Sequence, residues 1–480
     1  MNLFNRVFNL DECSSTSQPS VYFNQHFNDT DNNSRLDSVN QHHYHNNHAN
    51  GNISNNLSKL ILQLKNCRLI RDNKLIKDDL FIRNGVILNP EKLFFDEKAT
   101  ADMQIDCENL ILAPGFIDVQ LNGGFGKDFT DNTAENIHND LNFVSSELLQ
   151  YGVTSFCPTI ISSDSSTYSK LIPNIRRSLD RGGKGAHVLG IHLEGPFISN
   201  DKPGCHDEST LQTFKNGINS IEQVYGMNIE KLKEHVSIIT LAPELDLNGD
   251  IIRYLKENGF CVSIGHSTAN LAVGEKAFEN GARFITHLYN AMLPFHHRDP
   301  HLIGLLSNRN LVKQENIYYG IIADDIHTHP SAINISYKAH PSGLVLVTDS
   351  MAAMGLEDGK THKLGNKMVD IVCDPVNKRL RSAYVQGTKT LCGSVATMDD
   401  CVKNLMNATG CSLVEAVNCA TEHPAKLLNL YPRKGSLNYG ADADFIIIDE
   451  HVNVKATFIN GDLAWSEPNW SPLFNYKFIP

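Results

Sequence analysis

The chain has 480 residues, 41% of them apolar and 20% charged, and it carries a formal net charge of −12. This length allows one large hydrophobic core plus a smaller domain, and the acidic balance argues against non-specific binding to nucleic acid or to anionic membranes. No segment approaches the roughly 20 apolar residues of a membrane span, and the N-terminus resembles neither a secretory signal nor a transit peptide. The eleven cysteines contain no C-x-x-C pair, which favours thiols in a reducing compartment over zinc ligands, so we expect a cytoplasmic protein.

The first 58 residues are rich in Asn and contain a histidine cluster, "HHYHNNH", at 42–48. Few aliphatic residues lie between them, so the tract cannot bury enough apolar surface to offset the entropy lost on ordering. We expect residues 1–58 to form a disordered leader, in which the histidine cluster binds metal only adventitiously.

Short alternating runs follow, separated by Asp-Asn and Asn-Gly turn signals: "LILQLKNCRLI", "DLFIRNGVIL" and "ADMQIDCENLILAP". A matching set returns near the other end of the chain, in "ADADFIIIDEHVNVKATFINGDLAW" at 441–465. These patterns predict one small β-sandwich domain, built from residues 59–112 and from residues 431–480, which include a C-terminal tail.

The central region, 113–430, alternates between apolar runs and amphipathic helical patterns such as "NDLNFVSSELLQYG" and "ANLAVGEKAFENG". The eight runs are "LAPGFIDVQ", "VTSFCPTII", "HVLGIHLEG", "VSIITLAPE", "FCVSIGHS", "RFITHLYN", "YYGIIADDIH" and "GLVLVTDS". Eight strands alternating with helices over this length predict an α/β fold of the (β/α)8 TIM-barrel type. A doubly wound open sheet is the alternative, disfavoured because no G-x-G-x-x-G follows the first strand.

Chemically active side chains gather at the ends of the predicted strands, which face the active site in such a barrel. They are Gln120, Glu194, His266, His287 and Asp349. A carboxylate, two imidazoles and a separate acid are what a mononuclear catalytic metal requires: three protein ligands, an open position and a nearby proton acceptor.

The stretch "LGIHLEGPFIS" ends a strand in Glu194 before the turn at Gly195-Pro196. We expect this turn to direct the Glu194 carboxylate into the barrel mouth. His192 lies on the same face of the strand, either as a support for the metal ligands or as a deeper, layer-filling residue, and we favour the first.

The motifs "APGFIDVQLNGGFG", "HLEGPFI", "GHSTA", "THLYNAM", "GIIADDIH" and "VLVTDS" resemble those of the N-acetylglucosamine-6-phosphate deacetylase family of the amidohydrolase superfamily. The resemblance extends from about residue 60 to about 470. The animal-type members are more similar than the bacterial ones to two further stretches, "GTKTLCGSVATMDDCV" and "GADADFIIIDE". Strand one of the wider superfamily commonly ends in His-x-His, whereas this chain reads Val119-Gln120-Leu121-Asn122, and the bridging lysine of binuclear relatives has no evident counterpart. We therefore expect one divalent ion per subunit, with zinc favoured over iron, cobalt or manganese and Gln120 as a weak or water-mediated neighbour.

The resemblance implies hydrolysis of N-acetylglucosamine 6-phosphate to glucosamine 6-phosphate and acetate, in amino-sugar catabolism and recycling. It implies Glu194, His266 and His287 as metal ligands and Asp349 as base and then acid.

The loop residue His206 aligns with a family histidine that contacts the acetyl carbonyl. Asn290 and Ala291 are expected to orient the sugar phosphate, and His327 and Arg298 to bind the phosphate itself. Arg298 is further expected to reach the neighbouring active site of a homodimer.

Two other hypotheses remain. A cyclic-amide or dihydroorotase-like amidohydrolase is disfavoured by the missing His-x-His. A catalytically silent relative is disfavoured because the ligand-type residues are all retained.

Overall fold

The computed structural model describes residues 60–178, 185–313, 317–364, 367–374, 381–388, 391–468 and 477–478. The predicted leader, residues 1–58, lies outside the described residues. All elements below belong to one compact unit that spans Ile61–Pro480. No helix in the described parts of the chain is long and apolar enough to cross a membrane.

The centre of this unit is a parallel barrel with eight strand positions, in which each strand pairs with the next along the chain. All eight predicted runs form strands: β8 (Phe116–Leu121), β11 (Val153–Ile161), β12 (His187–Val188) with β13 (Ile191–Glu194), β14 (Val236–Leu241), β15 (Cys261–Ile264), β16 (Ala282–Ile285), β17 (Tyr318–Ile321) and β18 (Leu344–Leu346). They are apolar without alternation because helices cover their outer face and side chains fill the barrel.

The barrel closes between its first and last strands without a regular ladder. A parallel bridge joins Leu121 to Ser350, and the Asp349 backbone N–H donates to the Gln120 carbonyl oxygen at 2.9 Å. The buried Asp118 carboxylate completes the seam by accepting the Thr348 hydroxyl at 2.5 Å. The seam therefore ends beside Asp349.

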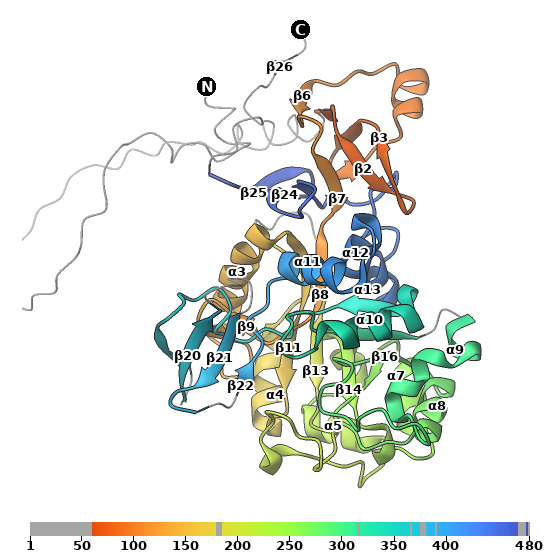
Figure 1. Cartoon of the computed structure of the whole chain (residues 1–480), viewed down its shortest axis with the longest axis vertical. Helices are drawn as coiled ribbons and strands as arrows, with labels where there is room; N and C mark the ends of the chain where they lie inside the picture. Colours follow the sequence, from red (N-terminus) through yellow and green to blue (C-terminus); the bar gives the residue numbers. More distant parts are fainter. Residues whose placement is uncertain are drawn as a thin grey trace, which may run out of the picture. The chain divides into compact units, whose positions relative to one another are not determined.

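The helices surround these strands in Figure 1. They are α3 (Ile137–Glu147), α4 (Ser165–Leu171), α5 (Asn219–Tyr225), α6 (Ile229–His235), α7 (Asp250–Glu257), α8 (Leu271–Glu279), α9 (Arg309–Lys313), α10 (Pro330–Ala339), α11 (Met398–Thr409), α12 (Leu413–Ala420) and α13 (Glu422–Leu427). Shorter turns are η2 (Lys92–Asp96), η3 (Leu148–Tyr151), η4 (Ile172–Asn174), η5 (Glu208–Thr210), η6 (Pro243–Leu245), η7 (His301–Ser307) and η8 (Pro341–Gly343). Residues at the two ends of helix α8 show how the sequence sets its limits. The Asn270 side chain caps its start by accepting the Val273 N–H, and Gly281 follows its end.

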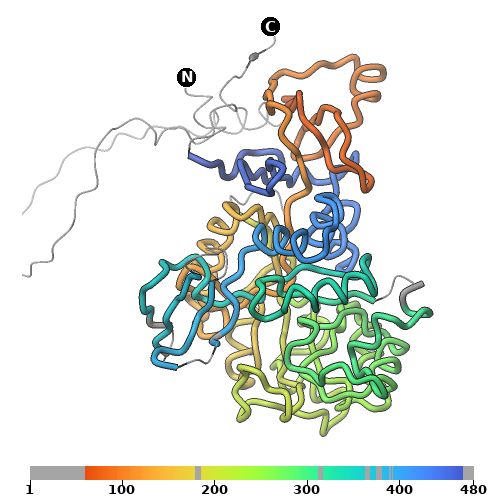
Figure 2. Tube along the Cα trace, viewed as in Figure 1, coloured from red at the N-terminus to blue at the C-terminus, as the bar shows by residue number. Residues whose placement is uncertain are grey.

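Two further sheets form the predicted β-sandwich, and Figure 2 shows the first described segment, in orange, beside the last long one, in dark blue. One sheet holds β1 (Leu62–Lys65), β4 (Leu80–Arg83), β5 (Val86–Ile87), β6 (Met103–Asp106) and β26 (Lys477–Phe478); the other holds β2 (Arg68–Arg71), β3 (Lys74–Lys77), β7 (Ile111–Pro114), β23 (Phe445–Ile448), β24 (Val454–Ile459) and β25 (Asp462–Ser466). Its core joins residues from both chain ends, among them Leu64, Leu112 and Phe445, and Phe445 stacks on Phe458. The predicted fold, a (β/α)8 barrel with a small β-sandwich, is confirmed.

A four-stranded antiparallel sheet between β18 and α11 was not predicted. It consists of β19 (Thr361–Leu364), β20 (Lys367–Cys373), β21 (Arg381–Val385) and β22 (Leu391–Gly393), and a two-stranded hairpin, β9 (Gly123–Gly124) with β10 (Lys127–Asp128), follows β8. The apolar residues of the larger sheet form only a small cluster in which Val369 and Ile371 lie with Ala353. So few buried positions give a weak alternating signal in the sequence.

Candidate active site

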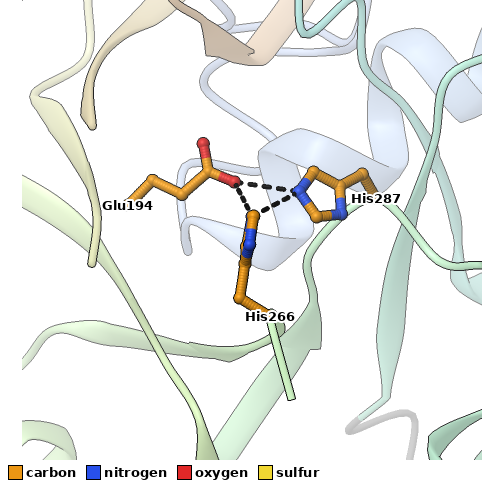
Figure 3. A group of neighbouring side chains, drawn as sticks. All are labelled: Glu194, His266 and His287. Atoms are coloured by element: carbon orange, nitrogen blue, oxygen red, sulfur yellow. Dashed lines mark hydrogen bonds and ion pairs between the residues drawn. The ribbon is translucent and has the colours of Figure 1, made fainter. Parts of the chain in front are cut away.

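Three strand ends bring a carboxylate and two imidazoles together at the barrel mouth (Figure 3). Glu194 ends β13, while His266 and His287 each lie two residues beyond their strands, β15 and β16. Glu194 Oε1 lies 3.0 Å from His266 Nε2 and 2.9 Å from His287 Nε2, and the two nitrogens are 3.0 Å apart. Each residue is at most 4% exposed. The structure thus brings together the three residues predicted to bind metal.

The backbone at these strand ends adopts uncommon conformations. His266, His287 and Asp349 have φ of 47°, 29° and 49°, in the left-handed region that non-glycine residues rarely adopt. Gly195, which follows Glu194, has φ of 83°, and a Cβ there would lie 2.3 Å from Ser162 Oγ. Only glycine fits at that turn, and the strained strand ends orient the functional side chains.

The donor set matches a divalent cation. His266 Nδ1 lies 2.9 Å from the Lys202 carbonyl oxygen, which can only accept, so a neutral His266 carries its proton on Nδ1. Its Nε2 lone pair then faces Glu194 Oε1 and His287 Nε2. Lone pairs that converge in a buried site repel one another unless a cation lies between them, and imidazole nitrogens with a carboxylate oxygen are the donors that Zn²⁺ takes.

The ionisable groups of the cluster shift one another's pKa values. Burial raises the pKa of Glu194, but its hydrogen bonds to the two histidines outweigh this and hold it well below its usual range. Burial lowers the pKa of His287, yet the hydrogen bond and charge of Glu194 raise it to about 9. Glu194 is therefore ionised between the two imidazoles, which is the state in which a carboxylate can bind a metal ion.

Asp349 lies beside the cluster, and side-chain amides hold it there. Asn122 Nδ2 donates to Asp349 Oδ1 at 2.7 Å, and Gln120 Nε2 donates to the same oxygen at 3.2 Å and to Glu194 Oε1 at 3.1 Å. Burial and the Glu194 charge raise the pKa of Asp349 to about 7. A carboxyl group with a pKa near neutrality can both accept and return a proton.

His206 lies against the metal-binding cluster, with its ring 4.6 Å from that of His266. The Ser162 backbone N–H donates to His206 Nδ1 at 3.2 Å, and this fixed donor requires a lone pair on Nδ1. Burial lowers the pKa of His206 to about 3. The ring is therefore neutral near pH 7 and carries its proton on Nε2, where it can donate.

The predicted substrate-binding residues lie on the loops after β16 and β17. Asn290 Nδ2 is buried without a hydrogen-bond partner among the described residues, and Ala291 has φ of 49°. His327 Nδ1 bonds the buried Asp324 carboxylate at 2.6 Å; burial lowers the pKa of His327, but Asp324 raises it overall. Arg298 lies on an exposed loop.

His192 corrects an expectation. Its Nδ1 lies 3.0 Å from the Val119 carbonyl oxygen and its Nε2 2.7 Å from Thr240 Oγ1, and neither nitrogen bonds a metal-binding candidate. Burial lowers its pKa to about 4. It fills an interior layer of the barrel as a neutral, hydrogen-bonded side chain, which is the alternative we had disfavoured.

Two residues of the site were missed in the sequence. Asn122 binds Asp349, and Asp324 binds His327 and accepts the backbone N–H groups of Ile326 and His327. The signal for Asp324 was present in "ADDIH", where an acid precedes the histidine by three residues. Asn122 had no local signal, because its partner comes from the last strand.

Comparisons with known proteins agree with this architecture. Residues 111–464 match the amidohydrolase family. N-acetylglucosamine-6-phosphate deacetylase of Danio rerio is 50% identical over 406 residues, 84% of this chain and 97% of that protein. The Homo sapiens protein of the same name is 49% identical over 407 residues, 84% of this chain and 96% of that protein.

Among solved structures, a variant of N-acetyl-D-glucosamine-6-phosphate deacetylase from Mycobacterium smegmatis, in complex with N-acetyl-D-glucosamine-6-phosphate, aligns with a TM-score of 0.70. It is 25% identical, and the alignment covers 85% of this chain and all of that one. The chain belongs to the amidohydrolase family and, within it, to the N-acetylglucosamine-6-phosphate deacetylases.

Proposed function

We propose that this protein hydrolyses the acetamide of N-acetyl-D-glucosamine 6-phosphate, releasing D-glucosamine 6-phosphate and acetate. The observation that carries the proposal is the convergence of Glu194, His266 and His287 on one point, with the carboxylate of Asp349 beside them. The related deacetylase that binds N-acetyl-D-glucosamine-6-phosphate supports this choice of substrate. The scattered cysteines of the sequence support a cytosolic location.

Glu194, His266 and His287 would hold one divalent ion per subunit, and we propose zinc because two imidazoles and a carboxylate, with a fourth position left open, suit a catalytic zinc. Such an ion supplies Lewis-acid chemistry, which polarises an acyl oxygen and makes water nucleophilic near neutral pH. Gln120, expected as a weak or water-mediated neighbour of the ion, donates a hydrogen bond to Glu194 through Nε2.

Asp349 is the proposed proton carrier. Its carboxylate accepts a proton from the attacking water and returns it to the amine as the C–N bond breaks. This needs one group that is stable in both protonation states, which agrees with a pKa raised to about 7 by burial and by Glu194.

His206 is the proposed donor to the acetyl carbonyl oxygen. A neutral ring whose Nδ1 accepts from Ser162 presents Nε2–H, and this donor stabilises negative charge as it develops on that oxygen. Because the pKa of His206 is lowered to about 3, the ring stays neutral near pH 7.

The sugar phosphate is assigned to the loops after β16 and β17. Asn290 offers a buried, unpartnered amide N–H, Ala291 its backbone, and His327 a ring that the Asp324 carboxylate favours in its charged form. We propose that Arg298, exposed on its loop, completes this site in the neighbouring subunit of a homodimer by binding phosphate oxygens.

The test combines metal analysis with an acetate-release assay on the purified protein. We expect a divalent ion in the wild type and turnover of the phosphorylated sugar. The variants His266→Ala and His287→Ala should lose both metal and activity, since two remaining ligands hold zinc weakly. Asp325→Asn, on the loop after β17 and not assigned to any role, serves as a control that should retain metal. Full metal occupancy in the histidine variants would overturn the ligand set, and a metal-loaded wild type that releases no acetate would overturn the function.

A further inference from the structure

Two side-chain amides at the end of β8 bind both carboxylates of the site. Gln120 Nε2 lies between Glu194 Oε1, at 3.1 Å, and Asp349 Oδ1, at 3.2 Å. Asn122 Nδ2 reaches the same Asp349 oxygen at 2.7 Å. Two amide N–H donors therefore meet on Oδ1 of Asp349, and one of the two side chains also bonds Glu194.

The orientation of both amides follows from their partners. Carboxylate oxygens accept only, so each amide must turn its NH₂ group toward them. This leaves the carbonyl oxygens, Gln120 Oε1 and Asn122 Oδ1, buried without a partner among the described residues. An unsatisfied buried acceptor is destabilising, so the orientation of both amides follows from the carboxylates they bind rather than from their own carbonyl oxygens.

The positive charges that the chain places near the two carboxylates come from histidines, His287 and His327. Glu194 and Asp349 are bonded by no lysine or arginine in the described residues, and the charge of Glu194 raises the pKa of Asp349. Neutral N–H donors between two carboxylates reduce their repulsion without adding a titratable group.

We propose that Gln120 and Asn122 are positioning residues that fix Asp349 through its Oδ1 oxygen and so make Oδ2 the oxygen that accepts and returns the proton. The inference rests on the proposed function, because it assigns an atom to the proton transfer described above. The proton moves from the attacking water to Asp349 Oδ2 and from there to the amine, while both amides keep their own protons throughout.

The main test is Asn122→Ala. Its backbone contacts do not depend on the side chain: Asn122 N–H donates to the Ser350 carbonyl at 2.8 Å, and its own carbonyl accepts Phe129 N–H at 3.0 Å. We expect kcat to fall about 10- to 100-fold, the usual cost of losing such a supporting hydrogen bond, with KM and metal content little changed. Gln120→Met, of similar shape without the amide, should lower kcat in the same way.

The acidic limb of the pH–rate profile gives a readout that a purely structural role would not move. Losing a donor to Asp349 destabilises the carboxylate, so the limb should shift to higher pH in Asn122→Ala. Glu194, His287 and His327, the titratable groups that face Asp349, are unchanged in this variant.

Asn132→Ala is the matched control. This amide lies in the loop after β10: its Nδ2 donates to the Asp128 carbonyl and the Asp140 carboxylate, and its Oδ1 accepts the Thr133 N–H, so it contacts neither carboxylate of the site. We expect wild-type kcat and pH profile. Wild-type kinetics in Asn122→Ala and Gln120→Met, or activity lost only in proportion to metal, would overturn the inference. A wild type that releases no acetate would instead overturn the proposed function.

Discussion

One strand position of the barrel carries a buried charged cluster at each of its ends. His187 begins β12 and lies beside Lys434 and Asp444, whereas Glu194 ends β13 and lies among the histidines of the mouth. Both clusters are buried, and both contain a histidine within hydrogen-bonding distance of a carboxylate. They differ in where their positive charge comes from.

The cluster around His187 is balanced by the chain itself. Lys434 Nζ pairs with Asp444 and, at 3.1 Å, with Asp442, which Arg433 Nε also contacts at 3.0 Å. Buried ion pairs of this kind are complete without a ligand and link the barrel to the sandwich. The mouth holds Glu194 and Asp349 without a lysine or arginine bonded to either in the described residues. A buried carboxylate whose only basic partners are imidazoles, which can bind a cation instead of a proton, indicates a binding site, whereas one paired with lysine and arginine indicates a structural role.

The largest expected effect is a loss of activity when Asp349, at the barrel mouth, is replaced. Asp349→Asn keeps the shape of the side chain but cannot accept a proton, so we expect acetate release to fall about 10²- to 10⁴-fold. Metal content should remain near that of the wild type, because Asp349 is not among the three converging ligands. Loss of metal together with activity would make Asp349 a ligand.

Lys434→Met breaks the balanced cluster and should act on stability instead. Removing one partner of a buried ion pair leaves uncompensated charge, at a cost of about 3–5 kcal/mol in the free energy of unfolding. Chemical denaturation measures this, and the folded fraction should still bind metal. Lys455→Met removes a half-exposed pair with Glu467 and should cost at most about 1 kcal/mol. Equal losses in the two variants would contradict the contrast between buried and surface pairs.

Low pH should reduce the contribution of the Lys434–Asp444 cluster to the stability of the fold. Burial by itself raises the pKa of Asp444. The hydrogen bond from His187 and the charge of Lys434 outweigh burial and lower this pKa from the usual 3.8 to about 2. A lowered pKa stabilises the fold above about pH 4, and that contribution, about 2 kcal/mol, is lost as the pH falls toward 2.

Denaturation curves across this range should show a smaller dependence on pH in Asp444→Asn, which starts from lower stability at neutral pH. Parallel pH dependences in the wild type and the variant would show that Asp444 does not carry the effect.

The sequence was sufficient for the barrel and for five of the residues in the mouth, Gln120 and Asp349 as well as the three metal-binding candidates, for a physical reason. Parallel strands buried on both faces read as continuous apolar runs, and a barrel places their last residues together, so Glu194, His266 and His287 were found as strand ends. Asn122 was not, because it meets Asp349 across the seam, 227 positions away. The interior position of His192 was also missed, since a strand pattern defines the face of a residue but not its layer in the barrel.

The last prediction concerns a positive charge that the mouth would obtain from a second copy of the chain. Arg298 lies on an exposed loop, and if it binds phosphate across a dimer, Arg298→Ala should raise KM for the phosphorylated sugar about tenfold, the equivalent of one charge-assisted hydrogen bond. The advantage over unphosphorylated N-acetylglucosamine should narrow accordingly. Mixing Arg298→Ala with Asp349→Asn subunits shows whether Arg298 acts in the active site of its own subunit or in that of the neighbouring subunit. In a shared site, one of the two heterodimer sites regains both an intact Asp349 and an intact arginine, so activity rises above that of either variant. If verified heterodimers show no such gain while the KM effect persists, Arg298 acts in its own subunit, and the mouth takes only its metal from outside the chain.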